Sequence, residues 1–134
     1  MSSTPAFAVT PRIGIGQIDT AQTNRDPGGT GTNIVDVIAG VSGGTKIFEV
    51  TIIAAVDPAD SLVQLFLHNG TSYFIFDDFD IGNPATSSAT VAGYRETRTY
   101  ENLVLPSSSW KLCASISVTT TSGKVNVWAF GADL

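Results

Sequence analysis

Few residues of this chain carry side chains suited to acid–base or nucleophilic chemistry, and they do not combine into a catalytic set. His68 is the only histidine, so a Ser-His-Asp triad would have to include it. It stands directly before Asn69-Gly70, a turn signal, and no G-x-S-x-G nucleophile motif accompanies it. A hydrolase or lyase that uses His68 with a carboxylate is the weakest function hypothesis. We predict that the protein is not an enzyme and uses no cofactor.

The densest group of carboxylates is Asp77-Asp78-Phe79-Asp80, with Asn83 close behind it. Crowded oxygen ligands on a loop are what Ca²⁺ binds, and Asp57 and Asp60 lie on another predicted loop. The spacing does not match the EF-hand loop, whose ligands occupy fixed positions around a glycine. We therefore expect an ordinary solvated acidic turn at this place rather than a metal site.

Two further motifs have simple structural interpretations. Cys113 is the only cysteine, so the chain forms no internal disulfide, which fits synthesis in a reducing cytoplasm. It alternates with Leu112 and Ala114 inside a predicted strand and is expected to be a small, at least half-buried thiol. The pair Gly14 and Gly16 is similar to a nucleotide-binding loop only superficially, because no helix is predicted after it.

Aromatic side chains suggest a sugar-binding face, because their rings stack on pyranose rings. In strands, however, aromatic residues are chiefly core residues, so we predict that most of them pack inside the protein. Trp110 stands beside a serine-rich turn and is the one that we single out as a binding residue. The aromatic residues considered are Tyr73, Phe74, Phe76, Phe79, Tyr94, Tyr100, Trp110, Trp128 and Phe130.

A period of two dominates wherever apolar residues are patterned, and this period is typical of β-strands. Residues 45–54 alternate, whereas 61–68 are apolar on both faces, as expected of a central strand. Asn69-Gly70 then predicts a hairpin with a type I′ turn into a strand over 72–77. No window carries a capped 3.6-residue period, so no substantial helix is expected. The other expected strands are 12–18, 33–38, 94–105, 110–118 and 124–130, the last two forming a C-terminal hairpin.

About eight strands joined by short turns predict a jelly-roll-like antiparallel β-sandwich. Residues 1–33 look different, because they are rich in Thr, Gln, Gly and Pro and alternate poorly. A segment with little apolar area does not offset its own ordering entropy. We therefore predict an extended N-terminal arm over 1–33, which is either mobile alone or ordered by a partner, and a β-sandwich domain over 34–134.

The composition limits the kinds of partner. A formal net charge of -5 and scattered cations argue against direct binding of nucleic acid. Charged residues make up 14% of the chain, against a usual share of about 25%, and charges are depleted at interface cores. A protein partner is therefore expected, and Arg12, Arg25, Tyr100 and Trp110 are the candidate contacts. Met1 to Thr10 has neither a charged start nor a long apolar run, so neither a secretory signal nor a membrane anchor is expected.

Four segments carry a resemblance to a known group of proteins: TKI (45–47), SLVQLFLHNGTSYFIFDD (61–78), LVLPSSSWKLCASI (103–116) and NVWAFGADL (126–134). They resemble small β-sandwich proteins encoded among the virion genes of tailed bacteriophages. The shared pattern is a V-x-L-F-x-x-(N/D)-G hairpin and an L-P segment followed by W-x-L-x-A. The resemblance covers roughly residues 43–134 and leaves the N-terminal third outside it.

This resemblance implies a structural virion protein, namely a capsid decoration or cement protein. Such proteins are often small jelly rolls that sit as trimers on the outside of the phage head. The implied partners are the major capsid protein and the other copies of a homotrimer, in a virion assembled in the host cytoplasm. The alternative is a tail, baseplate or fibre-associated β-sandwich that binds a host glycan or another virion protein.

Overall fold

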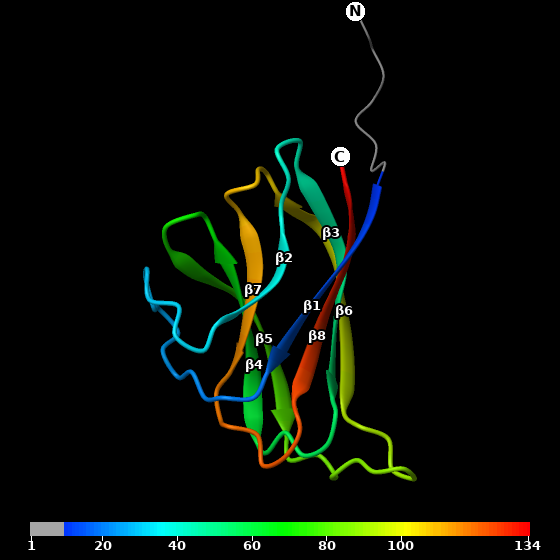
Figure 1. The fold of residues 1–134 in the computed structure, drawn as a ribbon. Helices are drawn as coiled ribbons and strands as arrows, with labels where there is room; N and C mark the ends of the chain where they lie inside the picture. The colour runs from blue at the N-terminus through cyan, green and yellow to red at the C-terminus, as the bar shows by residue number, and fades with distance from the viewer. Residues whose placement is uncertain (1–9) are drawn as a thin grey trace, which may run out of the picture.

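The computed structural model describes residues 10–134, which form eight β-strands (Figure 1). The predicted all-β fold class is confirmed, and the strands over 45–54 and 61–68 have the predicted bounds. None of the described residues belongs to a helix long and apolar enough to cross a membrane. In chain order the strands are β1 (Thr10–Ile18), β2 (Val35–Ala39), β3 (Thr45–Ala54), β4 (Ser61–His68), β5 (Tyr73–Gly82), β6 (Arg95–Leu105), β7 (Lys111–Ile116) and β8 (Val125–Asp133).

The strands form two antiparallel sheets of four, which we call sheet A (β1-β8-β3-β6) and sheet B (β2-β7-β4-β5). The first half of the chain pairs with the second half in reverse order: β1 with β8, β2 with β7, β3 with β6 and β4 with β5. The chain is therefore one long hairpin rolled into two layers, as in a jelly roll. This arrangement confirms the predicted jelly-roll-like antiparallel sandwich.

The core lies between the two sheets, because each strand directs alternate side chains inward. Val50 and Ile52 of sheet A and Val63 and Leu65 of sheet B are fully buried in one cluster. Burial of each such side chain stabilises the fold by roughly 1.5–3 kcal/mol. The core thus makes both sheets a rigid support for the residues on their outer faces.

The predicted hairpin between β4 and β5 is present, but its turn is not of type I′. His68 pairs with Tyr73, so the loop contains residues 69–72 instead of two residues. Gly70 has a φ of 99°, whereas Asn69 does not have the positive φ that a type I′ turn requires. The Asn69 Oδ1 atom instead accepts hydrogen bonds of 2.9 Å from the backbone N–H groups two and three residues ahead. This side-chain bond gives the loop its local structure in place of a two-residue turn.

The predicted C-terminal hairpin is wrong. β7 belongs to sheet B and β8 to sheet A, so the connection over 117–124 crosses from one sheet to the other. β7 instead pairs with β2 and β4, and β8 pairs with β1 and β3. Two neighbouring alternating segments are equally compatible with pairing and with facing one another across a core, so their periodicity does not separate the two arrangements.

The predicted arm over residues 1–33 is corrected in two places, and the first is β1. Residues 10–18 pair with β8 along their whole length, from Thr10 with Asp133 to Ile18 with Val125. The sandwich therefore begins before residue 34. Glycines occupy inward positions of β1, and so the alternation that marks a half-buried strand is hidden there. Residues 1–9 of the expected arm lie outside the described residues.

The second correction concerns residues 19–34, which run along sheet B instead of extending away (Figure 1). The Gln22 N–H donates to the Ile116 carbonyl at 2.8 Å, and the Tyr73 N–H donates to the Gly28 carbonyl at 2.7 Å. Ile34 completes a second small apolar cluster with side chains of β4 and β7. Backbone hydrogen bonds to the sheet supply the stability that the low apolar content of this segment does not.

Candidate functional site

The two outer faces of the sandwich differ, and the outer face of sheet A is the one that is open. On sheet B the outward residues Gln64, Phe66 and Ser115 are buried, and residues 19–34 contact this side of the sheet. On sheet A the outward side chains include large apolar groups exposed to solvent. We define the open face as Ile13, Ile15, Glu49, Thr51, Ile53, Arg95, Trp128 and Phe130.

Strand register brings these residues together from four strands. Ile15 of β1 lies opposite Trp128 of β8, which lies opposite Thr51 of β3, which lies opposite Thr97 of β6. The neighbouring rows run parallel to this central row, because successive outward residues on a strand are two positions apart. They are Ile13, Phe130, Glu49 and Thr99 on one side and Gln17, Asn126, Ile53 and Arg95 on the other.

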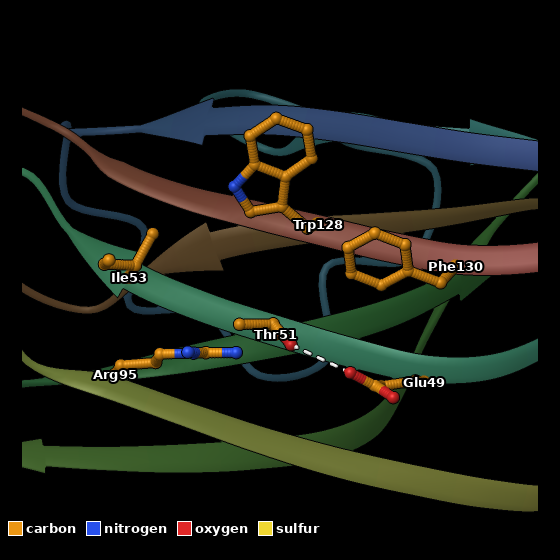
Figure 2. Close-up of a pocket in the computed structure, with 6 residues that line it drawn as sticks. All are labelled: Glu49, Thr51, Ile53, Arg95, Trp128 and Phe130. Carbon is orange, nitrogen blue, oxygen red and sulfur yellow. Dashed lines mark hydrogen bonds between the residues drawn. The ribbon is translucent and has the colours of Figure 1, made fainter.

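The centre of the open face is a shallow groove of about 340 Å³ (Figure 2). The Trp128 and Phe130 rings lie nearly parallel, with an interplanar angle of 9° and centroids 6.4 Å apart. Beside them, Ile13 and Ile15 are 66% and 44% exposed. Contiguous exposed apolar side chains of this kind mark interaction surfaces on soluble proteins.

Two charged side chains flank the groove, Glu49 and Arg95. Glu49 and Arg95 line it from positions separated along the strands (Figure 2). Within residues 10–134 neither of them forms a salt bridge, and Glu49 accepts only a long hydrogen bond of 3.4 Å from the Thr51 hydroxyl. The open face thus joins an apolar centre to one cation and one anion that have no salt-bridge partner among residues 10–134.

The predicted acidic turn is instead part of β5, and two of its carboxylates are engaged by side chains from other segments. Asp77 accepts hydrogen bonds from Arg98 at 2.6 Å and from the Tyr100 hydroxyl at 2.8 Å. Arg25 binds both oxygens of Asp78, at 3.1 and 2.7 Å. Among residues 10–134, no three His, Cys, Asp or Glu side chains are grouped as metal ligands.

The bonds around Asp77 shift its acidity and that of its partner. Burial by itself raises the pKa of Asp77, but the hydrogen bonds from Tyr100 and Arg98 outweigh burial, and its pKa is lowered. The pKa of Tyr100 is raised, mainly by burial and to a lesser extent by its hydrogen bond to Asp77. The carboxylate therefore stays charged and the phenol stays protonated at neutral pH, which makes this a structural link between β5 and β6.

His68 occupies the shoulder of the β4–β5 hairpin. Its Nδ1 atom accepts a hydrogen bond of 3.1 Å from the Gly70 N–H, and its ring lies 4.3 Å from the Tyr73 ring. No carboxylate among residues 10–134 is hydrogen-bonded to it. Among the described residues, His68 therefore lacks the hydrogen-bonded carboxylate that orients the catalytic histidine of a Ser-His-Asp triad.

Cys113 is fully buried in β7, within the range of burial expected from the sequence. Its pKa is raised to about 12, mainly by burial and to a lesser extent by the negative charge of Asp36. Its Sγ atom lies 3.4 Å from the Oδ1 atom of Asp36. The other carboxylate oxygen of Asp36, Oδ2, accepts a hydrogen bond of 3.0 Å from Lys111. A thiol held in its protonated form is a poor nucleophile.

Three of the four candidate contact residues have polar side-chain partners within the chain. Arg12 bridges sheets by binding Asp133 and the Ala39 carbonyl. Arg25 and Tyr100 bind β5 as described above, and Trp110 packs partly buried against the core cluster. Arg12 and Trp110 bond to the adjacent residues Ala39 and Gly40, and Arg25 and Tyr100 bond to the adjacent residues Asp78 and Asp77. Their role as partner contacts stays a prediction.

The prediction that most of the nine aromatic residues pack in the core is confirmed for Phe79 and in part for four others, Tyr73, Tyr94, Tyr100 and Trp110, which pack partly buried against the core clusters. It is wrong for Phe74, Phe76, Trp128 and Phe130. Phe79 is fully buried, whereas the others are half-buried or exposed. Trp128 and Phe130 belong to the open face, because they alternate along β8 with the buried Val127 and Ala129. The signal for this face was present in the sequence as a strand that is apolar on both sides.

A second, larger groove of about 460 Å³ lies beside Tyr100, between β5 and β6. Its apolar side includes Leu67 and Phe76, and the Phe76 ring is tilted against the Tyr100 ring with centroids 5.3 Å apart. Glu101 and Asn102 line its polar side, and neither side chain is hydrogen-bonded within residues 10–134. Aromatic rings next to free polar groups form a surface on which a sugar can stack.

Similarity to known proteins is found when structures are compared but not when sequences are compared. No protein-family model matches the chain, and no curated protein matches its sequence at a significant level. The fold is similar to a chain in the acid-stable capsid structure of the Helicobacter pylori bacteriophage KHP30, with a TM-score of 0.60 and 13% identity over 96% of this chain and 90% of that one. A chain of the cyanophage Pam1 capsid has a TM-score of 0.49 and 12% identity over 100% and 92%. The expected likeness to β-sandwich proteins of phage capsids is confirmed at the level of the fold.

Proposed function

We propose that the protein is a capsid decoration protein, which binds the outside of a phage head and stabilises contacts between major capsid subunits. The observation that carries this proposal is the open face, a rigid and largely apolar surface on a jelly-roll-like fold. The similarity in fold to a chain of a phage capsid structure supports the same role. The open face is the surface that we assign to the capsid shell.

Decoration would stabilise the head by mass action. A protein that binds only the assembled shell shifts the equilibrium toward that shell in proportion to its concentration over its dissociation constant. Trp128 lies at the centre of the open face, and a large aromatic side chain at the centre of an interface commonly carries much of the binding energy. Bound copies form homotrimers on the shell, as the sequence resemblance implies, after synthesis in the host cytoplasm.

Co-sedimentation with undecorated capsids tests this function. The native protein is expected to pellet with capsids at micromolar concentrations, and Trp128→Ala is expected to stay largely in the supernatant. Phe74→Ala is the matched control, because Phe74 is also a large exposed aromatic residue but lies on β5 of sheet B. A native protein that stays in the supernatant contradicts the proposal, and so does an equal loss of binding in both variants.

A second candidate function is glycan binding by a tail, baseplate or fibre protein. The observation that favours it is the groove beside Tyr100, which combines Phe76 with the free polar side chains of Glu101 and Asn102. On a glycan array the native protein is expected to bind a subset of neutral sugars, and Phe76→Ala to lose that binding. A flat array for the native protein removes this candidate.

A further inference from the structure

In the free protein, the open face is exposed to water unless another molecule covers it. Isolated apolar side chains on a surface are ordinary, but this face joins four large ones across two adjacent strands, β1 and β8. We propose that two copies of the free protein pair through their open faces about a two-fold axis. This inference goes beyond the proposed function and does not depend on it.

The positions of Glu49 and Arg95 favour a second copy of this chain as the partner. Glu49 and Thr51 are successive outward residues of β3, and Ile53, the next one, lies opposite Arg95 of β6. The row through Thr51 is therefore midway between the row that contains Glu49 and the row that contains Arg95. A two-fold axis along this central row exchanges the two outer rows.

Such an axis brings opposite charges together. Glu49 of one copy then faces the end of the second copy's open face that carries Arg95, and the same contact is repeated by symmetry. β3 and β6 are adjacent strands, so the lateral offset between the two side chains is about 4.8 Å, within reach of an arginine. Each charge, unpaired within residues 10–134 of one chain, gains an ion-pair partner in the pair of chains.

The central row supplies the apolar contact of the same arrangement. Trp128 and Ile15 lie on the axis row and would meet their own counterparts, as the centre of an isologous interface requires. Ile13 and Phe130 lie one row away and would pack beside them. An apolar centre with charged groups at its margin is the general anatomy of protein interfaces.

Charge reversal with light scattering tests the pairing in the absence of capsids. At tens of micromolar, the native protein is expected to have twice the chain mass of 14.0 kDa. Glu49→Arg and Arg95→Glu are each expected to reduce the mass to that of one chain, because like charges then face one another. An equimolar mixture of the two variants is expected to recover the doubled mass, since each introduced charge meets its opposite in the other variant.

The controls separate pairing from folding and from charge alone. Asp60→Arg makes the same change of charge on the connection between β3 and β4 and is expected to keep the doubled mass. Circular dichroism verifies that each variant folds; where a reversal does not, Glu49→Gln and Arg95→Gln replace it, and each is expected to weaken association about ten-fold.

A native mass of one or three chains overturns the inference, as does a mixture of the reversal variants that stays at one chain mass. These outcomes leave the capsid sedimentation result unaffected. A failure of the pairing is therefore distinguishable from a failure of the proposed function.

Discussion

Asp77 connects the two sheets through side chains that lie more than twenty residues away in the sequence. It belongs to β5 of sheet B, and its partners Arg98 and Tyr100 belong to β6 of sheet A. The Arg98 guanidinium also lies 4.4 Å from the centroid of the Phe79 ring, which is fully buried. Because these groups are only partly exposed, the bonds that they make contribute more to stability than a surface ion pair does.

The lowered pKa of Asp77 makes its contribution to stability depend on pH. A carboxylate with a lower pKa in the folded state stabilises the fold above its unfolded value, here near 3.8, and this stabilisation is lost as the pH falls through the folded value. Asp77→Asn is expected to lower the free energy of unfolding by about 1–2 kcal/mol at pH 7 and by less near pH 2. Urea unfolding at both pH values measures the difference.

Asp78→Asn is the control for this experiment, because Asp78 pairs with Arg25 on the exposed surface. Its effect at pH 7 is expected to be below about 1 kcal/mol. Equal losses in the two variants, or a loss for Asp77→Asn that does not decrease in acid, would show that the bonds around Asp77 are not the source of the stability.

The close approach of β1 to β2 explains the two glycines of β1. Gly14 and Gly16 point inward at the seam where these two strands from different sheets meet. A Cβ atom at Gly14 would collide with the backbone oxygen of Val37, and one at Gly16 would press against the backbone oxygen of Asp36. The glycines therefore allow the two sheets to approach at this edge.

Gly14→Val is expected to destabilise the protein by about 1–3 kcal/mol or more, because backbone atoms cannot rotate away from the added side chain as a flexible side chain would. Thermal unfolding followed by circular dichroism measures the loss. Gln17→Val, an outward position of the same strand, is the control and is expected to change the melting temperature little. A Gly14→Val variant as stable as the native protein would contradict the close contact between β1 and β2.

The whole molecule has two unlike sides as a result of its connectivity. The long connection between β1 and β2 returns along sheet B and contributes to burying its outer residues, whereas the outer face of sheet A has no such cover among residues 10–134 (Figure 1). The open face therefore presents apolar side chains of β1 and β8 to solvent. Both the proposed capsid contact and the proposed pairing of free copies rest on this difference between the two sheets.

The sequence by itself determined the strands, because alternation is a local property of the chain. Residues 45–54 and 61–68 could be assigned to their ends, and Asn69-Gly70 located the hairpin that joins β4 to β5. The presence of eight strands was likewise readable from residue types. The strands follow from neighbours in the chain, which the sequence contains in full.

Only the tertiary structure decided which strands pair and which side of each faces the core. Val127 and Trp128 are both apolar, and the choice of Val127 for the core depends on strands from distant parts of the chain. The partners of Asp77 and the cover over sheet B likewise arise from contacts between segments far apart in sequence. A period of two distinguishes the two faces of a strand but carries no information about what lies opposite each face. The open face could therefore not be predicted from the sequence.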